Sequence, residues 1–447
     1  MILGKQKTNQ NTILSMIKIF NTKSKDFKKK LNYYLSLRRR HSESKVNSVR
    51  KIVKDVRKYK DKSIIKYERR FNNIKFLSKK NFYFSNTEIE KNIKKLDNKV
   101  KNSIDLAFNR IFSFHKNQKF KGFKIKDSYN NIFSYRSKPI SKVGIYVPGG
   151  RASYPSSVMM NCIPAIIAGV KEIYMTVPSL HGRINPGVLY AAKKCKIQKI
   201  FKLGGAQAIA AFAFGTQSIQ KVDKIVGPGN EYVALAKKEI SGISGIDMFA
   251  GPSEVTVVAD KYSNPEWISA DLIAQSEHDE MSQSILISDN QDLIFKVRNL
   301  IVRQLKFLPK RKIASSSLSE FGLAILVKNL REASEIVNLI APEHLQIYTR
   351  QPNKYLKLIN NAGSIFLGPY SPEAIGDYLA GPNHVLPTSG TARFSSGLSV
   401  FDFIKRQSVI KISKRGIEKL GPSVVTLSKY ENLHGHANSV KQRLKKR

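Results

Sequence analysis

The spacing of hydrophobic and polar positions changes along the chain and predicts two kinds of structure. Between residues 88 and 114, apolar residues recur at three- and four-residue intervals, which predicts one amphipathic helix packed on a larger body. From about Ile140 onward, short β-branched runs alternate with alanine-rich stretches of helical length. Strands that alternate with helices in this way are typical of βαβ units and a mostly parallel sheet.

This alternation lasts long enough to predict two successive α/β bodies. Strands are expected at 143–147, 173–177, 199–203, 224–226, 254–259, 284–288, 323–327 and 364–367, and helices at 186–195, 206–214, 265–277, 293–305 and 330–340. Residues 389–397 are rich in Ser, Gly and Thr and predict a flexible linker. The last fifty residues are too short for another α/β domain and are expected to pack on something else.

The predicted fold class is therefore α/β, with two Rossmann-like parallel-sheet bodies facing each other across a cleft and a small C-terminal helical extension. The expected divisions are a basic N-terminal extension at 1–20, a helical region at 21–145 that packs on the second body, the first body at 146–254, the second body at 255–393, and the C-terminal extension at 394–447.

The charge of the chain widens the range of functions to consider. Its 447 residues include 77 Lys and Arg but only 33 Asp and Glu, which gives a net charge of +44. Such a charge is typical of proteins that bind nucleic acid or an anionic surface. A general drift of composition toward Lys, Asn and Ile explains it better, because the basic residues occur singly or in short runs, without a zinc-finger or RNA-recognition motif.

Other features of the composition favour a cytoplasmic protein. No stretch approaches the roughly 20 apolar residues that a membrane-spanning helix needs. The first 20 residues lack the apolar run and the cleavage pattern of a signal peptide. The two cysteines, Cys162 and Cys195, are too few for a disulfide framework or a CxxC-type zinc site.

Four glycine-rich turns lie at or near the ends of predicted strands, at 148–150, 204–207, 227–230 and 251–254. Open α/β sheets bind ligands at strand ends, glycine lets the backbone approach a ligand closely, and helix N-termini attract phosphates. None of the turns fits the G-x-G-x-x-G or Walker patterns. Any one of them is best interpreted as an ordinary turn, but four in one body favour a ligand-binding edge.

Several titratable residues are candidates for chemistry. Gln275 and His278 share one face of a predicted helix and are candidates for a metal site, although a surface histidine is the simpler interpretation. Glu343 and His344 follow a proline-initiated turn, where a carboxylate beside an imidazole suits acid/base work. Further candidates are Asp377 and His384 in a Gly- and Pro-rich segment, and Glu431, His434 and His436 near the C-terminus, where a solvated tail is the alternative.

Taken together, these motifs resemble the histidinol dehydrogenase family. The resemblance runs in order over 140–440, through the segments 143–150, 204–208, 222–230, 250–254, 275–278, 341–346, 376–384 and 431–436. It implies oxidation of L-histidinol, through the aldehyde, to L-histidine with two NAD, the last step of histidine biosynthesis. It also implies a homodimer with one zinc per site and a C-terminal dimerisation extension that reaches the neighbouring subunit.

The resemblance also implies roles for individual residues. The zinc ligands would be Gln275, His278, Asp377 and His436, and the catalytic pair would be Glu343 and His344. Substrate contacts would be Ser253, Gln275, His278, His344, Asp377, His384, Glu431 and His436, and the NAD contacts on the first body would be Tyr146, Gln207 and Asn230. Two nitrogens and two oxygens form a donor set that suits Zn²⁺. A neutral His344 would take the alcohol proton, and Glu343 would activate the water that attacks the aldehyde.

Two departures and two rival interpretations accompany this prediction. Asn432 stands where the family usually has glycine, and His434 is an additional histidine. The first rival is a basic nucleic-acid-binding protein that retains an enzyme-like scaffold, which the intact set of metal and acid/base residues argues against. The second is a zinc hydrolase, which the glycine-rich turns and the absence of an HExxH motif argue against.

Overall fold

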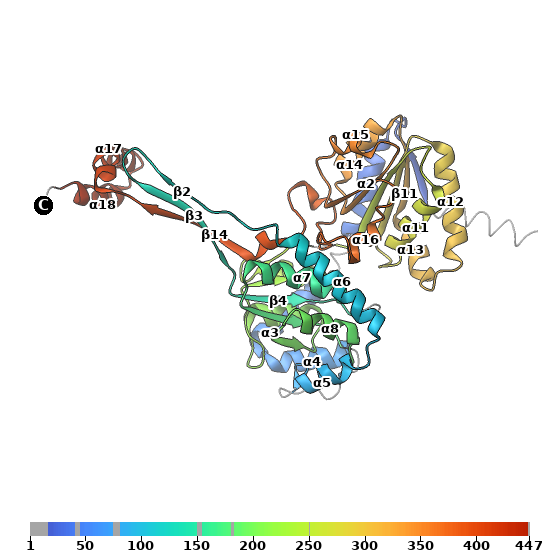
Figure 1. The fold of residues 1–447 in the computed structure, drawn as a ribbon, viewed down its shortest axis with the longest axis horizontal. Coiled ribbons are helices and arrows are strands. Elements are labelled where there is room, and N and C mark those ends of the chain that lie inside the picture. Colours follow the sequence, from blue (N-terminus) through green and yellow to red (C-terminus); the bar gives the residue numbers. More distant parts are fainter. Residues whose placement is uncertain are drawn as a thin grey trace, which may run out of the picture.

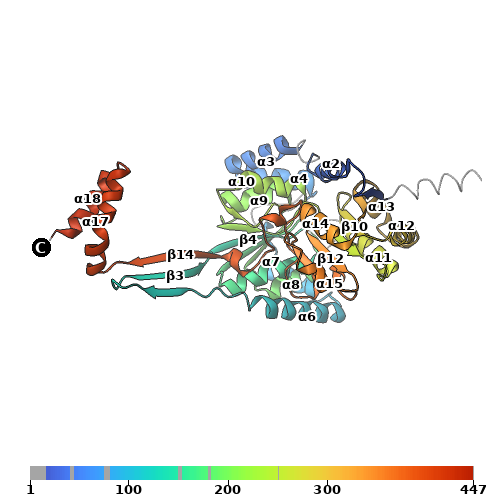
Figure 2. The same cartoon turned by 90° about the horizontal axis from the view of Figure 1, so that it is seen from above.

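The computed structural model describes residues 17–40, 45–74, 81–149, 154–179, 183–249 and 251–445. These residues form two α/β bodies and a long arm that ends in two helices (Figure 1 and Figure 2). Most of the expected N-terminal extension, and the expected motif positions 150 and 250, lie outside the described residues. Among the described helices, none combines the length and the apolarity that crossing a membrane requires.

The first body is a five-stranded parallel sheet in the order β6-β5-β4-β7-β8. Its strands are β4 (Lys142–Tyr146), β5 (Glu172–Thr176), β6 (Lys199–Phe201), β7 (Lys224–Val226) and β8 (Gly245–Ile246), and its helices are α7 (Pro155–Ala168), α8 (Pro186–Lys194), α9 (Gly205–Phe214) and α10 (Glu231–Ile240). The apolar, β-branched strands are buried between helices on both faces, as expected for parallel sheets.

The second body is a six-stranded parallel sheet in the order β1-β11-β10-β9-β12-β13. Its strands are β1 (Lys18–Asn21), β9 (Glu254–Ala259), β10 (Gln283–Ser288), β11 (Gly322–Leu326), β12 (His344–Tyr348) and β13 (Ser364–Leu367), and its helices are α11 (Pro265–Ser276), α12 (Gln291–Leu305), α13 (Arg311–Phe321), α14 (Leu330–Ile340), α15 (Pro352–Leu356) and α16 (Glu373–Tyr378). The α/β class and the two parallel-sheet bodies are confirmed.

The N-terminal helices divide between the two bodies, which corrects one expectation. Helix α2 (Phe27–Arg40) packs on the second sheet, whereas α3 (Val46–Tyr59), α4 (Asp61–Phe71), α5 (Asn86–Ile93) and α6 (Asn98–His115) have their apolar faces in the cores around the first sheet. The prediction that 21–145 packs on the second body is therefore wrong for most of that segment. An amphipathic pattern shows that a helix has an apolar face but does not show which sheet covers it.

The single helix expected at 88–114 is in fact two helices. Helix α5 ends at Ile93, and α6 begins after Asp97, whose side chain accepts a hydrogen bond from the Lys99 amide at 2.6 Å. The apolar spacing continues across the break because both helices pack against the same core. Asp97, an N-cap residue type inside the apolar pattern, was therefore the sequence signal for the break.

The arm is built from β2 (Phe123–Lys126), β3 (Ile132–Pro139) and β14 (Ile404–Lys411), which form an antiparallel ribbon. At its tip, α17 (Lys414–Tyr430) packs against α18 (His434–Leu444), so the last helices lie away from both bodies (Figure 1 and Figure 2). The small C-terminal helical extension is confirmed. The sequence analysis missed the strands of the ribbon, whose residues are mostly exposed and carry no strong apolar alternation.

Candidate active site

A loop between α16 and β14 joins the two bodies near most of the candidate residues. The Asn383 side chain donates a hydrogen bond to the Met160 carbonyl of α7 at 2.6 Å, and His384 Nε2 lies 3.5 Å from Ser157 Oγ. Farther along the loop, Thr388 Oγ1 accepts a hydrogen bond from the Gly251 amide. The linker that was expected at 389–397 therefore begins in a part of this loop that hydrogen bonds hold to the second body.

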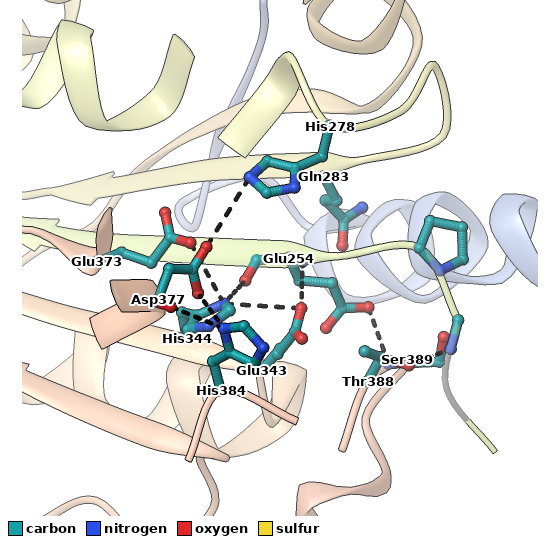
Figure 3. Close-up of polar contacts among 12 residues, drawn as sticks. Glu254, His278, Gln283, Glu343, His344, Glu373, Asp377, His384, Thr388 and Ser389 are labelled. Carbon is teal, nitrogen blue, oxygen red and sulfur yellow. Dashed lines mark hydrogen bonds and ion pairs between the residues drawn. The ribbon is translucent and has the colours of Figure 1, made fainter. Parts of the chain in front are cut away.

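Glu343 and His344 lie where β12 begins, beside the start of β9. The sequence analysis predicted only a proline-initiated turn here, but His344 is the first residue of β12, a strand that it missed. Glu343 Oε2 accepts a hydrogen bond from the Glu254 amide at 2.7 Å, and His344 Nδ1 lies 3.0 Å from the Glu254 carbonyl oxygen. One backbone residue therefore holds both side chains of the pair (Figure 3).

This geometry determines the tautomer of His344. A carbonyl oxygen only accepts hydrogen bonds, so Nδ1 must carry a proton to bond the Glu254 carbonyl. The ring is buried, and burial lowers its pKa below the ordinary histidine value. His344 is consequently a neutral imidazole whose Nε2 is free to accept a proton.

The carboxyl group of Glu343 lies in a site that disfavours its negative charge. Burial raises its pKa well above the ordinary value, and the nearby carboxylate of Glu254 adds to the effect. The Glu254 amide opposes this by donating to Glu343 Oε2. The raised pKa makes the carboxylate of Glu343, when it is ionised, a stronger base than an ordinary glutamate.

Three of the four expected metal ligands come from the second body. His278 Nε2 lies 4.0 Å from Asp377 Oδ2, and Asp377 Oδ1 lies 3.5 Å from His384 Nδ1 (Figure 3). Burial opposes the ionisation of Asp377, but the surrounding histidines outweigh it and lower its pKa to about 2. Gln275 lies near the end of α11, three residues before His278, and α11 packs against α16, which carries Asp377.

Gln275 has an unusual environment for a buried amide. Its side chain is fully buried, and neither Oε1 nor Nε2 has a hydrogen-bond partner among the described residues. Leaving such a group unpaired costs about 1–3 kcal/mol. A cation bound beside the turn that leads to His278 would satisfy the amide oxygen, so this orphaned group fits a ligand role.

A second grouping of potential ligands overlaps with this set. Donor atoms of His344, Glu373 and Asp377 all lie within 4.8 Å of one another. Burial raises the pKa of Glu373 well above its ordinary value, as burial also does for Glu343. The His344 ring already donates through Nδ1. Because the unpaired Gln275 amide independently indicates a bound cation, we favour Gln275, His278 and Asp377 for the metal and leave His344 for proton transfer.

The remaining expected substrate contacts are divided in space. Ser253 directly precedes β9, and its carbonyl oxygen accepts a hydrogen bond from the Gln283 amide at 3.0 Å. Glu431 and His436 belong to the helical tip of the arm, where both are exposed. Within one chain, the structure does not bring these two residues to the other candidates (Figure 1).

The three expected NAD contacts gather at the carboxyl edge of the first sheet. Tyr146 ends β4, and its hydroxyl accepts a hydrogen bond from the Gly205 amide at 3.1 Å. Gln207 lies in the first turn of α9, and Asn230 caps the N-terminus of α10. Gly227, with φ of +113°, allows the turn between them, because a Cβ there would lie 2.0 Å from the Tyr146 carbonyl oxygen.

Sequence reasoning missed Glu68, a buried carboxyl group behind this edge. Its Oε1 accepts hydrogen bonds from the Gly204 amide at 3.0 Å and from Gln207 Nε2 at 2.9 Å. Burial raises its pKa, although these donors oppose the rise. Glu68 lies in a polar helical segment without a motif, so its sequence context carried no indication of this role.

Comparison with known proteins agrees with this arrangement. The model of the histidinol dehydrogenase family matches residues 36–444. The chain belongs to the histidinol dehydrogenase family. The histidinol dehydrogenase of Pelagibacter ubique (strain HTCC1062) is 52% identical over 97% of this chain and 100% of its own length, and that of Agrobacterium fabrum is 46% identical over 94% and 97%.

A solved structure extends the family match to the fold. The crystal structure of histidinol dehydrogenase from Elizabethkingia anophelis superposes with a TM-score of 0.88 at 36% identity, covering 96% of this chain and 98% of that one. The chain is thus an NAD-dependent oxidoreductase of histidine biosynthesis, in a family that uses NAD and zinc. Nothing in these comparisons supports the nucleic-acid-binding alternative.

Proposed function

We propose that this chain oxidises L-histidinol through L-histidinal to L-histidine, with Glu343 and His344 as the two proton-transfer groups. The observation that carries the proposal is the shared anchor of the pair, because the amide and the carbonyl of Glu254 hold one side chain each. Two different bases are thereby fixed next to Asp377 and the histidines around it.

The alcohol step requires removal of a hydroxyl proton as hydride leaves the neighbouring carbon. His344 suits this task, because Nδ1 is committed to the Glu254 carbonyl and Nε2 carries the lone pair. The buried, neutral ring also avoids placing a positive charge near the proton that it must accept. His344 therefore acts as the base in the first oxidation.

The aldehyde step requires water as well as a base. After His344 has released the proton of the alcohol step to solvent, Glu343 takes one proton from the water that adds to the aldehyde carbon. The anionic tetrahedral adduct then loses the remaining water proton to His344 as hydride departs, which leaves the carboxylate. When bound, NAD accepts the hydride in both oxidations and zinc orients the substrate.

The donor chemistry of the second body fits zinc. Gln275, His278 and Asp377 would hold the ion through one amide oxygen, one imidazole nitrogen and one carboxylate. The unpaired Gln275 amide supports this assignment, since a bound cation would give its oxygen a partner. His384 would orient Asp377, because its Nδ1 lies 3.0 Å from the Asp377 carbonyl and 3.5 Å from the side chain.

The fourth ligand, His436, and the substrate contact Glu431 would come from a second copy of the chain. The arm holds both residues away from the bodies of their own chain (Figure 2). Its last helices also expose apolar side chains, including Leu420, Val424 and Leu427. A homodimer in which each arm reaches the partner's site would bury that surface and complete the ligand set.

The function is tested by NADH formation from L-histidinol with purified protein, before and after zinc chelation. Activity that is lost with the chelator and restored by zinc supports the proposal, and the absence of NADH from zinc-loaded protein contradicts it. Sharing of sites is tested by mixing His436→Ala chains with His344→Ala chains. Only heterodimers then contain one intact site, so no recovered activity would refute the shared site. A cytoplasmic location stays a prediction.

A further inference from the structure

Glu254 has a side chain that none of the roles above uses. Its carboxylate is buried at the start of β9, with a relative exposure of 6%, and forms an ion pair with Arg38, whose side chain is 4% exposed. Glu254 Oε1 also accepts a hydrogen bond from the Ser389 amide at 2.8 Å (Figure 3). The residue whose backbone holds Glu343 and His344 is therefore itself held by its side chain.

Arg38 holds this segment at two points. It comes from α2, the helix that packs on the second sheet, and lies 216 positions away from Glu254 in the sequence. One guanidinium nitrogen, Nη1, bonds the Glu254 carboxylate, and the other, Nη2, donates to the Pro252 carbonyl. Both bonds come from one planar group, so they fix the segment on either side of Ser253.

The loop that carries His384 also bonds this segment. Its Thr388 hydroxyl accepts from the Gly251 amide, and its Ser389 amide donates to Glu254. The segment 251–254 is thus bonded both by α2 and by this loop, and Arg38 and the Ser389 amide donate to the same oxygen, Glu254 Oε1. The last residue of this segment, Glu254, bonds the side chains of Glu343 and His344 through its backbone.

We propose that Arg38 and Glu254 are positioning residues that hold the Glu254 backbone where it aligns Glu343 and His344. The inference rests on the proton-transfer roles proposed above. Arg38 touches neither member of the pair and would act only through the backbone at 252–254. A shift of that backbone would move the carbonyl that orients the imidazole and the amide that orients the carboxyl group.

The expected effect of losing Arg38 is on turnover. Misplacing a proton acceptor by about 1 Å costs on the order of 100-fold in rate, and loss of a residue that orients a functional group typically costs about 10- to 100-fold. Arg38→Ala should therefore lower kcat for histidinol by about 10- to 100-fold. The KM for NAD should stay unchanged, because the candidate NAD contacts lie on the first body.

A matched control is available on the same helix. The Tyr34 hydroxyl of α2 donates to the Gly322 carbonyl at 3.0 Å and is buried against the same sheet. Tyr34→Phe removes this bond without touching Glu254, so kcat should stay at the parent value even if the melting temperature falls. Equal losses of kcat in Tyr34→Phe and Arg38→Ala would show a general loosening of α2 and overturn the proposal.

A double-mutant cycle with His344→Ala separates positioning from stability. If Arg38 acts through the pair, Arg38→Ala should slow the alcohol step of the parent enzyme but add less than about twofold to the loss of that step in His344→Ala, because Glu343 serves only the aldehyde step. Full additivity would overturn the positioning role while leaving the role of His344 intact. Conversely, a His344→Ala enzyme with parental turnover would refute the role proposed for His344, on which this inference rests.

Chemical rescue supplies a second readout that a structural defect would not show. Arg38 lines a cavity of about 310 Å³ together with Glu254, Gln283 and Ser389, so the space left in Arg38→Ala is reachable from solvent. Added guanidinium, below denaturing concentrations, should raise kcat of Arg38→Ala and leave that of Tyr34→Phe unchanged. No rescue would count against the proposal.

The buried ion pair itself could be needed for folding, because removing one partner leaves an uncompensated buried charge. If Arg38→Ala does not fold, Glu254→Gln and Arg38→Lys take its place. Glu254→Gln keeps an acceptor oxygen for the Ser389 amide, and Arg38→Lys keeps the charge but can bond only one of the two acceptors. Both should fold and lower kcat without changing the KM for NAD, and parental kcat in both would overturn the proposal.

Discussion

Replacing Glu343 by glutamine should separate the two oxidations. The side-chain oxygen that remains in Glu343→Gln can still accept the Glu254 amide hydrogen bond, which is 2.7 Å long in the parent protein. The geometry of the neighbouring His344 should therefore be preserved, because its own bond goes to the Glu254 carbonyl. What Glu343→Gln removes is the ability to take a proton from water.

The size of the effect follows from the burial of the site. Both members of the pair are buried, so bulk water cannot replace the missing base. Loss of general-base catalysis typically costs about 10²–10⁴-fold in rate, equivalent to about 3–5 kcal/mol of activation free energy. We expect this loss in the aldehyde step and less than about 10-fold in the alcohol step, since only the aldehyde step consumes water. His344→Ala should slow both steps.

The assay is single-turnover NADH formation, started in one experiment from histidinol and in another from histidinal. Glu343→Gln should give a first burst of NADH from histidinol, followed by accumulation of the aldehyde. The matched control is Glu373→Gln. Glu373 is another buried carboxyl group of the same site, but the proposed mechanism does not use it to take a proton from water. An equal loss in Glu343→Gln with the two substrates would refute the division of roles within the pair.

Three further predictions concern stability, NAD and zinc. Burial raises the folded-state pKa of Asp271 from 3.8 to about 6, so its ionisation opposes folding as pH rises through that interval. Asp271→Asn, which keeps an acceptor for the Gln346 amide, should thus stabilise the metal-free protein by up to about 3 kcal/mol above pH 7 and not at all near pH 4; a pH-independent shift in thermal unfolding would contradict this. Glu68→Ala should raise the KM for NAD about 10-fold by releasing Gln207, and Glu68→Gln should raise it less; unchanged KM in both would disprove the anchoring role. Gln275→Ala should weaken zinc binding at least about 10-fold in chelator competition, whatever its activity; parental zinc affinity would remove Gln275 from the ligand set.

The accuracy of the sequence prediction depended on how local each feature was. The strand at 254–259 and the helix at 330–340 match β9 and α14, because periodic burial is written into neighbouring residues. The strand β12 was missed because the turn at Ala341 and Pro342 indicated irregular structure after the helix. Pairing with β9, which lies far away in the sequence, makes the next residues a strand. The break between α5 and α6 was missed because both helices pack against the same core, so their apolar residues keep helical spacing across the break.

The sequence by itself determined that this chain is an α/β enzyme of a recognisable family, with an adjacent Glu343 and His344 and with glycine-rich turns at strand ends. It was wrong to place all four turns in one body, because the turn at 251–254 leads into β9 of the second body. These features depend on local spacing and on short motifs. Only the tertiary structure decided that the Glu254 backbone holds the pair, that Arg38 reaches it from 216 positions away, and that Glu431 and His436 lie on an arm apart from it. Such contacts arise from the packing of helices and loops against particular sheet faces, and that packing is a property of the whole chain.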